Sequence, residues 1–371
     1  MPSRPSRRKR TGAFAALNAL RNLVSDSMSV DMGSASTIID VRGRGIVIDE
    51  PSVVAVSRMT GEIVAFGAEA RQMQGREARD VALVAPMVDG VVADFERTQA
   101  MLDYFVRKAR SGFSHFSRRA VMSVLSGVTH VEQRALLSAA EAAHIGRVYM
   151  VEEGLAAAIG AGVEPDDVSA SAVVDLGGGT TNVAVVAQGT IVHAHAERTG
   201  SFDIDAAIVD RLRRHHGLII GTRTAERLKV ELGSATPPEE SLARLEVKGR
   251  DVQTGAPEAT EVRAEEIYQA GQTALRKIAQ AVRDALAALP PEVAADIYDR
   301  GIILTGGGAQ LKGLQQYLQG ETRLRVKIAE EPRLATVRGL AQLFDEPLLL
   351  RRVTRNEPQM LLDSPDARTI F

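Results

Sequence analysis

Short β-branched runs alternate with longer segments of helical period along most of this chain. Apolar runs at residues 120–125 and 148–151 enclose an alanine-rich helical segment at 131–144. A later segment, 262–289, keeps its apolar residues on one helical face and stops at a Pro-Pro pair. Strands that alternate with helices of this length favour a mostly parallel sheet covered by helices. The pattern therefore predicts an α/β protein.

Other segments are expected to surround this core. Helices are predicted at 97–110, 206–215 and 224–232, and the Pro-, Glu-, Thr- and Gly-rich residues 234–262 indicate a small β insertion. From about residue 345 no period is visible, and the three leucines at 348–350 look exposed. We expect this end of the chain to be a tail or a contact for a partner.

The most informative stretch is residues 171–186, where two β-branched strands flank a turn. The turn holds one carboxylate, three glycines and two hydroxyls: Asp175, Gly177, Gly178, Gly179, Thr180 and Thr181. Glycine allows backbone amides to approach an anion closely, and the hydroxyls add further contacts. A carboxylate beside a phosphate needs a divalent cation between them. The stretch therefore indicates a hairpin that binds a metal-bound nucleotide, although a plain tight turn has the same composition.

The same order of residues occurs upstream at 29–39. An apolar strand leads to Asp31, then to Gly33, Ser34, Ala35 and Ser36, and a second apolar strand follows. Two such hairpins can hold a polyphosphate from opposite sides, with Asp31 and Asp175 facing one cation. A third glycine turn, Gly306, Gly307 and Gly308, follows the strand at 302–305 and suits close approach to a base or sugar.

Composition narrows the possibilities further. The chain has 371 residues, 45% of them apolar, no cysteine and a net charge of −2. This length suggests two to three domains, and the charge balance argues against nucleic acid as a specific partner. No apolar run reaches the roughly 18 residues of a membrane span. We expect a soluble cytoplasmic body without disulfides.

Two segments suggest contact with a membrane surface. Residues 1–10 are strongly basic, and helical projection of 12–24 gathers Leu17, Leu20, Leu23 and Val24 on one face. This pattern suits an anionic membrane, or equally a helix that docks on the protein itself. Phe113 and Phe116 lie in a polar loop with basic neighbours, where they either insert into lipid or fold under their own loop.

These motifs resemble the phosphate-one, phosphate-two and adenosine motifs of the superfamily of actin, heat-shock chaperones and sugar kinases. One branch of this superfamily, the MreB family of bacterial actins, has sequences that resemble residues 43–56, 86–95, 222–227 and 290–292 of this chain. The similarity covers about residues 28–345. The resemblance implies an α/β, two-lobed, actin-like ATPase fold with a duplicated ribonuclease-H-like core and two smaller insertion subdomains.

It also implies a division of the chain. Residues 1–27 form a basic arm with an amphipathic segment. Lobe I has its core at 28–52, 94–170 and 335–352 and its insertion at 53–93. Lobe II has its core at 171–204 and 265–334 and its insertion at 205–264, and 353–371 form a tail.

The resemblance further assigns roles to residues. Asp31 and Asp175 would hold Mg2+ through water, Glu153 with Thr180 and Asp175 would position the attacking water, and Glu226 and Lys229 would face the ribose and base of ATP or ADP. The implied protein polymerises into filaments on the inner face of the plasma membrane. With membrane-bound wall-synthesis and shape proteins, it maintains rod shape by organising cell-wall synthesis.

Several positions depart from the family pattern. Gly154 replaces a proline, Asn182 replaces a glutamate, and Ser201 and Phe202 replace Gly and Asp; Ser34 and Ser36 stand where the family has Thr and Asn. Gly154 is expected to loosen the helix start that positions Glu153. We expect these changes to leave nucleotide binding intact, but they put the rate of ATP hydrolysis in doubt. A nucleotide-binding scaffold and, less favoured, a small-molecule kinase are the alternatives.

Overall fold

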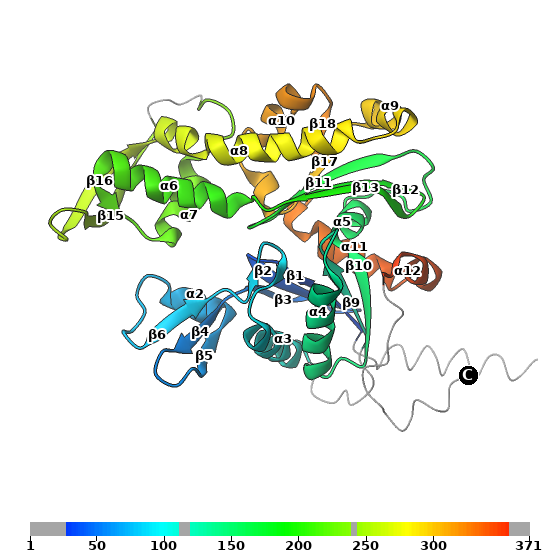
Figure 1. Ribbon diagram of the computed structural model, residues 1–371, viewed down its shortest axis with the longest axis horizontal. Coiled ribbons are helices and arrows are strands. Elements are labelled where there is room, and N and C mark those ends of the chain that lie inside the picture. Colours follow the sequence, from blue (N-terminus) through cyan, green and yellow to red (C-terminus); the bar gives the residue numbers. More distant parts are fainter. Residues whose placement is uncertain (1–26, 111–118, 239–242, 356–371) are drawn as a thin grey trace, which may run out of the picture.

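The computed structural model describes residues 27–110, 119–238 and 243–355. Two lobes lie one above the other, each built on a five-stranded sheet with helices packed against it (Figure 1). Strands and helices alternate along the chain as the hydrophobic pattern predicts, so the α/β class is confirmed. The expectation of mostly parallel sheets is wrong, because each sheet has two antiparallel and two parallel strand pairings.

The sheet of the lower lobe has the strand order β10-β9-β1-β2-β3. Its strands are β1 (Ser27–Met32), β2 (Ser36–Val41), β3 (Gly45–Pro51), β9 (Arg119–Val124) and β10 (Arg147–Glu152). The first three form antiparallel hairpins, whereas β1, β9 and β10 run parallel. Helices α3 (Phe95–Ala109) and α4 (His130–Ala142) cover one face. Both begin at side-chain caps: Asp94 accepts from the Arg97 amide, and Thr129 forms a capping box with Glu132.

The sheet of the upper lobe repeats this plan in the order β13-β12-β11-β17-β18. Its strands are β11 (Ser171–Leu176), β12 (Thr181–Ala187), β13 (Thr190–Glu197), β17 (Ile302–Thr305) and β18 (Val326–Ile328). Again the first three are antiparallel and the others join in parallel. The helices of this lobe are α6 (Ser201–His216), α8 (Ala264–Ala287), α9 (Pro291–Arg300) and α10 (Leu314–Thr322).

Each lobe carries a smaller extension on the same side of the molecule (Figure 1). The lower one contains β4 (Val54–Ser57), β5 (Ile63–Phe66), α2 (Gly67–Met73) and β6 (Val81–Val84), followed by the short hairpin β7 (Met87–Val88) and β8 (Val91–Val92). The upper one contains β14 (Leu218–Ile219), α7 (Thr222–Leu232), β15 (Arg244–Asp251) and β16 (Pro257–Arg263).

Two helices join the lobes. Helix α5 (Glu153–Gly160) and helix α11 (Ala335–Leu343) pack together between the two sheets, in a core that takes residues from both lobes. Their contact is close because glycines face the partner helix. A Cβ added at Gly160 would lie 1.8 Å from the Ala335 carbonyl oxygen, and one at Gly339 would lie 1.9 Å from that of Ala156. The sequence therefore fixes this crossing through its two glycines.

Three expectations about elements need correction. Helix α6 begins at Ser201 instead of residue 206, because Asp203 accepts a hydrogen bond from the Gly200 amide at the helix start. Val262 belongs to β16, so the long helix begins at Ala264. The end of the chain is not uniformly exposed: Pro347 begins α12 (Pro347–Val353), which buries Leu349 and Leu350 and leaves only Leu348 of the three leucines exposed. Seven residues are too few to show a helical period.

Candidate nucleotide-binding site

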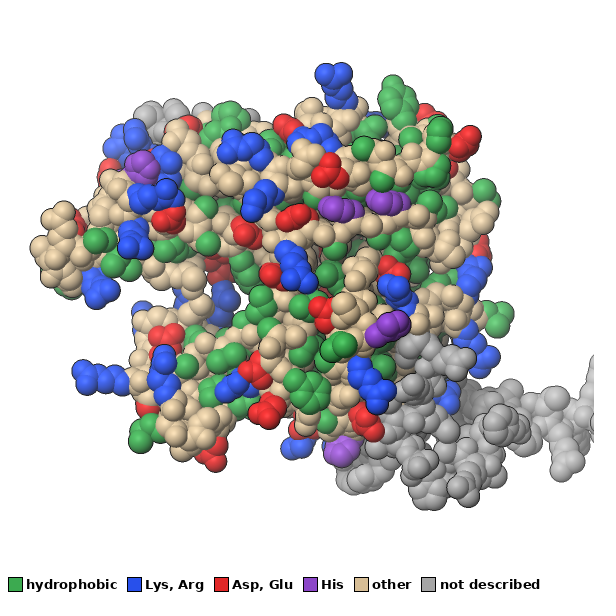
Figure 2. All heavy atoms as spheres, viewed as in Figure 1, with side chains coloured by type: hydrophobic (Ala, Val, Ile, Leu, Met, Phe, Trp, Pro, Cys, Tyr) green, Lys and Arg blue, Asp and Glu red, His purple; other side chains and the backbone are tan. Residues whose placement is uncertain are grey.

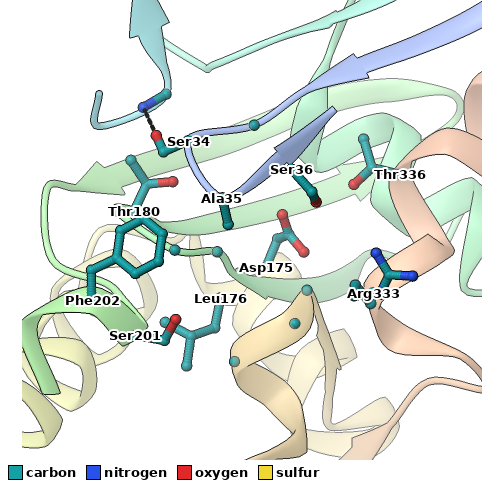
Figure 3. Close-up of a pocket in the computed structure, with 18 of the residues that line it drawn as sticks. Ser34, Ala35, Ser36, Asp175, Leu176, Thr180, Ser201, Phe202, Arg333 and Thr336 are labelled. Carbon is teal, nitrogen blue, oxygen red and sulfur yellow. Dashed lines mark hydrogen bonds between the residues drawn. The ribbon is translucent and has the colours of Figure 1, made fainter. Parts of the chain in front are cut away.

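A cavity of about 460 Å³ lies where the hairpins of the two lobes meet. Nearly all the residues predicted for the site line it: Asp31, Gly33, Ser34, Ala35, Ser36, Glu153, Asp175, Gly177, Gly178, Gly179, Thr180, Glu226, Lys229, Gly306, Gly307 and Gly308. These residues come from segments up to 277 positions apart, and the fold brings them together. Figure 3 shows the Asp175 carboxylate pointing toward Ser36 of the opposite hairpin.

The two hairpins are closed by the same type of backbone bond. The Gly33 amide donates to the Ser36 carbonyl at 3.0 Å, and the Gly177 amide donates to the Thr180 carbonyl at 2.8 Å. The hairpin tips approach so closely that a Cβ at Gly178 would lie 2.9 Å from the Ala35 side chain. Exposed backbone amides at two facing turns are suited to hold a chain of phosphates between them.

Three carboxyl groups meet at the floor of the cavity, and each has one uncharged hydrogen-bond donor. Ser123 Oγ donates to Asp31 at 2.7 Å, and Thr305 Oγ1 donates to Asp175 at 2.8 Å. Asn182 Nδ2 donates to Glu153 at 2.9 Å. The amide oxygen of Asn182 is buried without a partner among the described residues. The site thus brings three carboxyl groups together without a cationic side chain from the described ranges bonded to any of them.

Burial makes these groups unusually weak acids. It raises the pKa of Asp31 to about 6, with the Ser123 hydrogen bond opposing the shift and the charge of Asp175 adding to it. Burial, followed by the charges of Asp175 and Asp31, raises the pKa of Glu153 well above its ordinary value. Burial also raises the pKa of Asp175. Like charges in a confined site resist joint ionisation unless positive charge is supplied.

The cationic side chains that line the cavity are bonded elsewhere. Lys229 bonds to Asp205 at 2.8 Å, Lys312 donates to the Glu231 carbonyl, and Arg333 pairs with Asp49. Within the part of the chain that the structure describes, no three His, Cys, Asp or Glu side chains are close enough to ligate a metal together. Asp31 and Asp175 are the carboxylates of the cavity that could hold a hydrated divalent cation.

The third glycine turn is close to protein backbone. Gly306 has φ of +82°, and a Cβ there would lie 2.3 Å from the Leu176 carbonyl oxygen and 2.8 Å from Asp175 Oδ1. Gly306 therefore lets the end of β17 pack against the second hairpin. Gly307 has only Arg333 within 4 Å of its Cβ position, so the room for a ligand lies there.

Three predicted residues have different surroundings from those expected. Thr181 lies in β12, is fully buried and donates from Oγ1 to the Thr199 carbonyl at 2.7 Å, so it holds the α6 start instead of lining the cavity. Glu226 lines the cavity but pairs with Arg71 of the lower lobe. Lys229 lines it too, yet its ammonium group binds Asp205 and the Ser201 carbonyl.

Other residues join the site although they were not predicted as site residues. The β7–β8 turn lies across both hairpins: the Gly90 amide donates to Ser34 Oγ at 2.9 Å, the bond dashed in Figure 3, and Asp89 lies next to Gly179. Ser123 is the second-last residue of β9 and Thr305 is the last residue of β17, positions at strand ends that could have indicated them. The Phe202 ring packs against Gly178 and is 37% exposed.

The predicted membrane residues Leu17, Leu20, Leu23, Val24, Phe113 and Phe116 lie outside the described residues. Within the described ranges no helix has the length and apolar content of a membrane span.

Comparison with known proteins decides the family. The family model described as "MreB/Mbl protein" matches residues 25–351 of this chain. The chain belongs to the MreB/Mbl family. It is 42% identical over 328 residues to the cell shape-determining protein MreB of Escherichia coli (strain K12), covering 87% of this chain and 94% of that protein. It is 43% identical over 307 residues to the cell shape-determining protein Mbl of Bacillus cereus, covering 82% and 91%.

Solved structures of MreB relatives have the same fold. MreB5 of Spiroplasma citri bound to ADP matches with a TM-score of 0.83 and 30% identity over 88% of this chain and 98% of that one. Its complex with AMPPNP matches with a TM-score of 0.82. The MamK double helical filament, at 21% identity and a TM-score of 0.72, supports the fold alone. The predicted family and actin-like fold are confirmed.

One departure from the family pattern has a local explanation. Gly154 does not visibly loosen the start of α5, which begins at Glu153. A Cβ at Gly154 would lie 2.4 Å from that of Ala184, so glycine lets α5 pack directly on β12. The same strand carries Asn182, the residue that bonds to Glu153.

Proposed function

We propose that this protein binds and slowly hydrolyses ATP, and that nucleotide controls its assembly into filaments that help maintain cell shape. The observation that carries the proposal is the pair of facing hairpins above three buried carboxyl groups, Asp31, Glu153 and Asp175. MreB5 of Spiroplasma citri, which has the same fold, has been solved with ADP bound and with AMPPNP bound. Relatives of this chain are named as cell shape-determining proteins.

Each part of the site has a task in this proposal. The amides of both hairpin tips bind the phosphates, with Ser34, Ser36 and Thr180 adding hydroxyl contacts. Glu153 accepts a proton from the attacking water or orients it, and Asn182 fixes the direction of its carboxylate. Thr180 lies at the hairpin tip on the same cavity wall and assists in positioning the water. Phosphoryl transfer depends mainly on such positioning and on charge stabilisation.

Mg2+ would be held through water by Asp31 and Asp175. It would supply the positive charge that the lining side chains do not provide and would neutralise developing charge on the phosphates. In its presence the carboxyl groups ionise at lower pH, since an opposite charge favours the charged form. Asp175 would then serve both the ion and the orientation of the nucleophile.

Assembly and membrane contact are proposed from the family and the sequence. The MamK relative forms a double helical filament, and repetition of one heterologous contact gives an open polymer. Each lobe would move together with its insertion, and the two lobes would move relative to one another. The basic N-terminal segment and the Phe113 and Phe116 loop would place the filament on an anionic membrane, where wall-synthesis proteins are the expected partners.

The test of hydrolysis is a phosphate-release assay with Mg-ATP on the parent, Glu153→Gln and Glu152→Gln. Glu152 is the matched control because its carboxylate faces Ser126 and Arg355 instead of the cavity. We expect Glu153→Gln to lose at least about a hundredfold in release rate while retaining nucleotide, the lower end of the range that a general base contributes. Glu152→Gln should stay close to the parent. Equal rates in all three proteins would refute the role of Glu153.

One observation favours a second function, a nucleotide-bound scaffold with little turnover. The apolar Phe202 ring lies beside the Gly178 turn, where the family has an aspartate. If ATP stays bound to the purified parent and no phosphate appears, the scaffold replaces the ATPase.

A further inference from the structure

The two lobes also touch through their extensions, away from the α5–α11 crossing. Arg71 in α2 of the lower lobe forms an ion pair with Glu226 in α7 of the upper lobe, 155 residues away. Directly after α2, Gln74 Nε2 donates to Oγ1 of Thr222, the first residue of α7, at 2.6 Å. Figure 1 shows α2 on the upper side of the lower extension and α7 on the lower side of the upper extension, on the side of the molecule where Figure 2 shows the surface hollowed between the lobes.

These contacts bear directly on the cavity. Glu226 lines it, whereas Arg71 and Gln74 do not, so the pair ties a wall residue of one lobe to the outer surface of the other. Lys229, one turn further along α7, also lines the cavity and is anchored to Asp205 of α6. The α7 face that borders the cavity is thus fixed from both lobes.

A ligand in the cavity can leave only when its walls separate or through an existing opening. Separation of α2 from α7 must break the Arg71–Glu226 pair and the Gln74–Thr222 bond together. The paired side chains are 31% and 40% exposed, so water and salt weaken the ion pair without removing it. Such a contact suits a closure that must open repeatedly.

We propose that Arg71 and Gln74 are positioning residues that hold α2 against α7, close the nucleotide cavity and slow nucleotide exchange. The inference rests on the proposed nucleotide site and adds a control of its exchange from outside the cavity. Neither residue is expected to touch the reacting phosphates.

The test measures dissociation of a fluorescent ATP analogue, chased with excess ATP, from full-length protein at low and high salt. Five proteins are compared with the parent: Arg71→Glu, Glu226→Arg, the double exchange of both, Gln74→Ala and Arg76→Glu. Arg76 is the charge-matched control, since it lies three residues after the end of α2 and its side chain makes no hydrogen bond or ion pair with any described residue.

We expect each single reversal at 71 or 226 to speed dissociation about twofold to fivefold, the range that an exposed ion pair can supply. Gln74→Ala should give a smaller increase, and Arg76→Glu should match the parent. The double exchange should restore slow dissociation, and high salt should reduce the difference between parent and single variants. Unfolding temperatures without nucleotide should be similar throughout.

The outcomes separate the possible failures. In one outcome Glu226→Arg releases the analogue faster, Arg71→Glu releases it at the parent's rate, and the double exchange does not restore slow dissociation. Glu226 then contacts the nucleotide directly, and the closing contact is refuted. If the parent binds and all variants release it at one rate, the contact is likewise refuted but the site stands. If the parent binds no analogue, the proposed function itself fails.

Discussion

The carboxyl groups of Asp31, Glu153 and Asp175 are individual side chains whose ionisation matters for the whole site. The pKa of Asp31 is raised from 3.8 to about 6 in the fold. The folded state therefore favours the protonated form, and its stabilising contribution is complete below about pH 4 and is lost as pH rises through about 6. Without nucleotide or metal, ionised Asp31 works against folding at neutral pH.

The Asp31→Asn variant tests this linkage. Asparagine keeps the size of the side chain and removes the titration, so the variant should lose less stability than the parent between pH 5 and pH 7.5. The difference should be on the order of 2 kcal/mol, from the pKa shift and the linkage relation. Denaturant unfolding in EDTA measures it. Identical pH dependence in both proteins would show that Asp31 ionises freely in the fold.

Sequence reasoning identified the carboxylates and the glycines but not their partners. Asp31, Asp175 and Glu153 stand in local motifs, whereas Ser123 and Thr305 reach Asp31 and Asp175 from strands 92 and 130 residues away. Thr181, which was predicted to contact the nucleotide, does not line the cavity. Alternation along β12 turns its side chain away from the cavity, and a two-residue hydroxyl motif does not reveal which member faces inward.

Helices α5 and α11 are the elements on which the two lobes meet, and their packing depends on glycine. Gly160→Ala would place a methyl group against the Ala335 carbonyl, so we expect a loss of about 1–3 kcal/mol in unfolding free energy. Gly320→Ala, in α10 with nothing within 4 Å of its Cβ position, should instead be neutral or stabilising by up to about 1 kcal/mol. Thermal unfolding of both variants checks the contrast. Equal effects would show that α5 and α11 can separate freely.

The elements themselves followed from the sequence where they are long. The hydrophobic period placed α3, α4 and α8 within a few residues, and the β-branched runs placed β9 to β12. The hydrophobic period did not predict α12, which has only seven residues. It also did not predict the first turn of α6, whose start depends on the hydrogen bond between the Gly200 amide and Asp203. Short elements depend on tertiary packing that a local period does not contain.

At the scale of the whole molecule, the proposed membrane contact can be tested separately from nucleotide binding. Two double variants test it: one combines Leu20→Glu with Leu23→Glu, and the other combines Phe113→Ser with Phe116→Ser. Each should reduce co-sedimentation with anionic liposomes severalfold, because charged or polar side chains replace apolar anchors. Nucleotide binding should be unchanged in both. Full retention of liposome binding in one pair would assign the contact to the other segment, and retention in both would refute the two candidates.

The two-lobed arrangement was accessible from the repeated hairpin and the family resemblance. The contacts that relate the lobes were not: Arg71 with Glu226 and Arg333 with Asp49 join residues separated by 155 and 284 positions. Such pairs arise only after both lobes have folded, and each member looks like an ordinary surface charge in the sequence.

The most direct test of the account is sedimentation of the purified full-length protein with Mg-ATP, Mg-ADP or no nucleotide, with bound nucleotide measured in the same samples. The account predicts that Mg-ATP moves the protein into the pellet to a greater extent than the other two conditions. Protein that binds ATP yet sediments to the same extent in all three conditions would contradict nucleotide-controlled assembly.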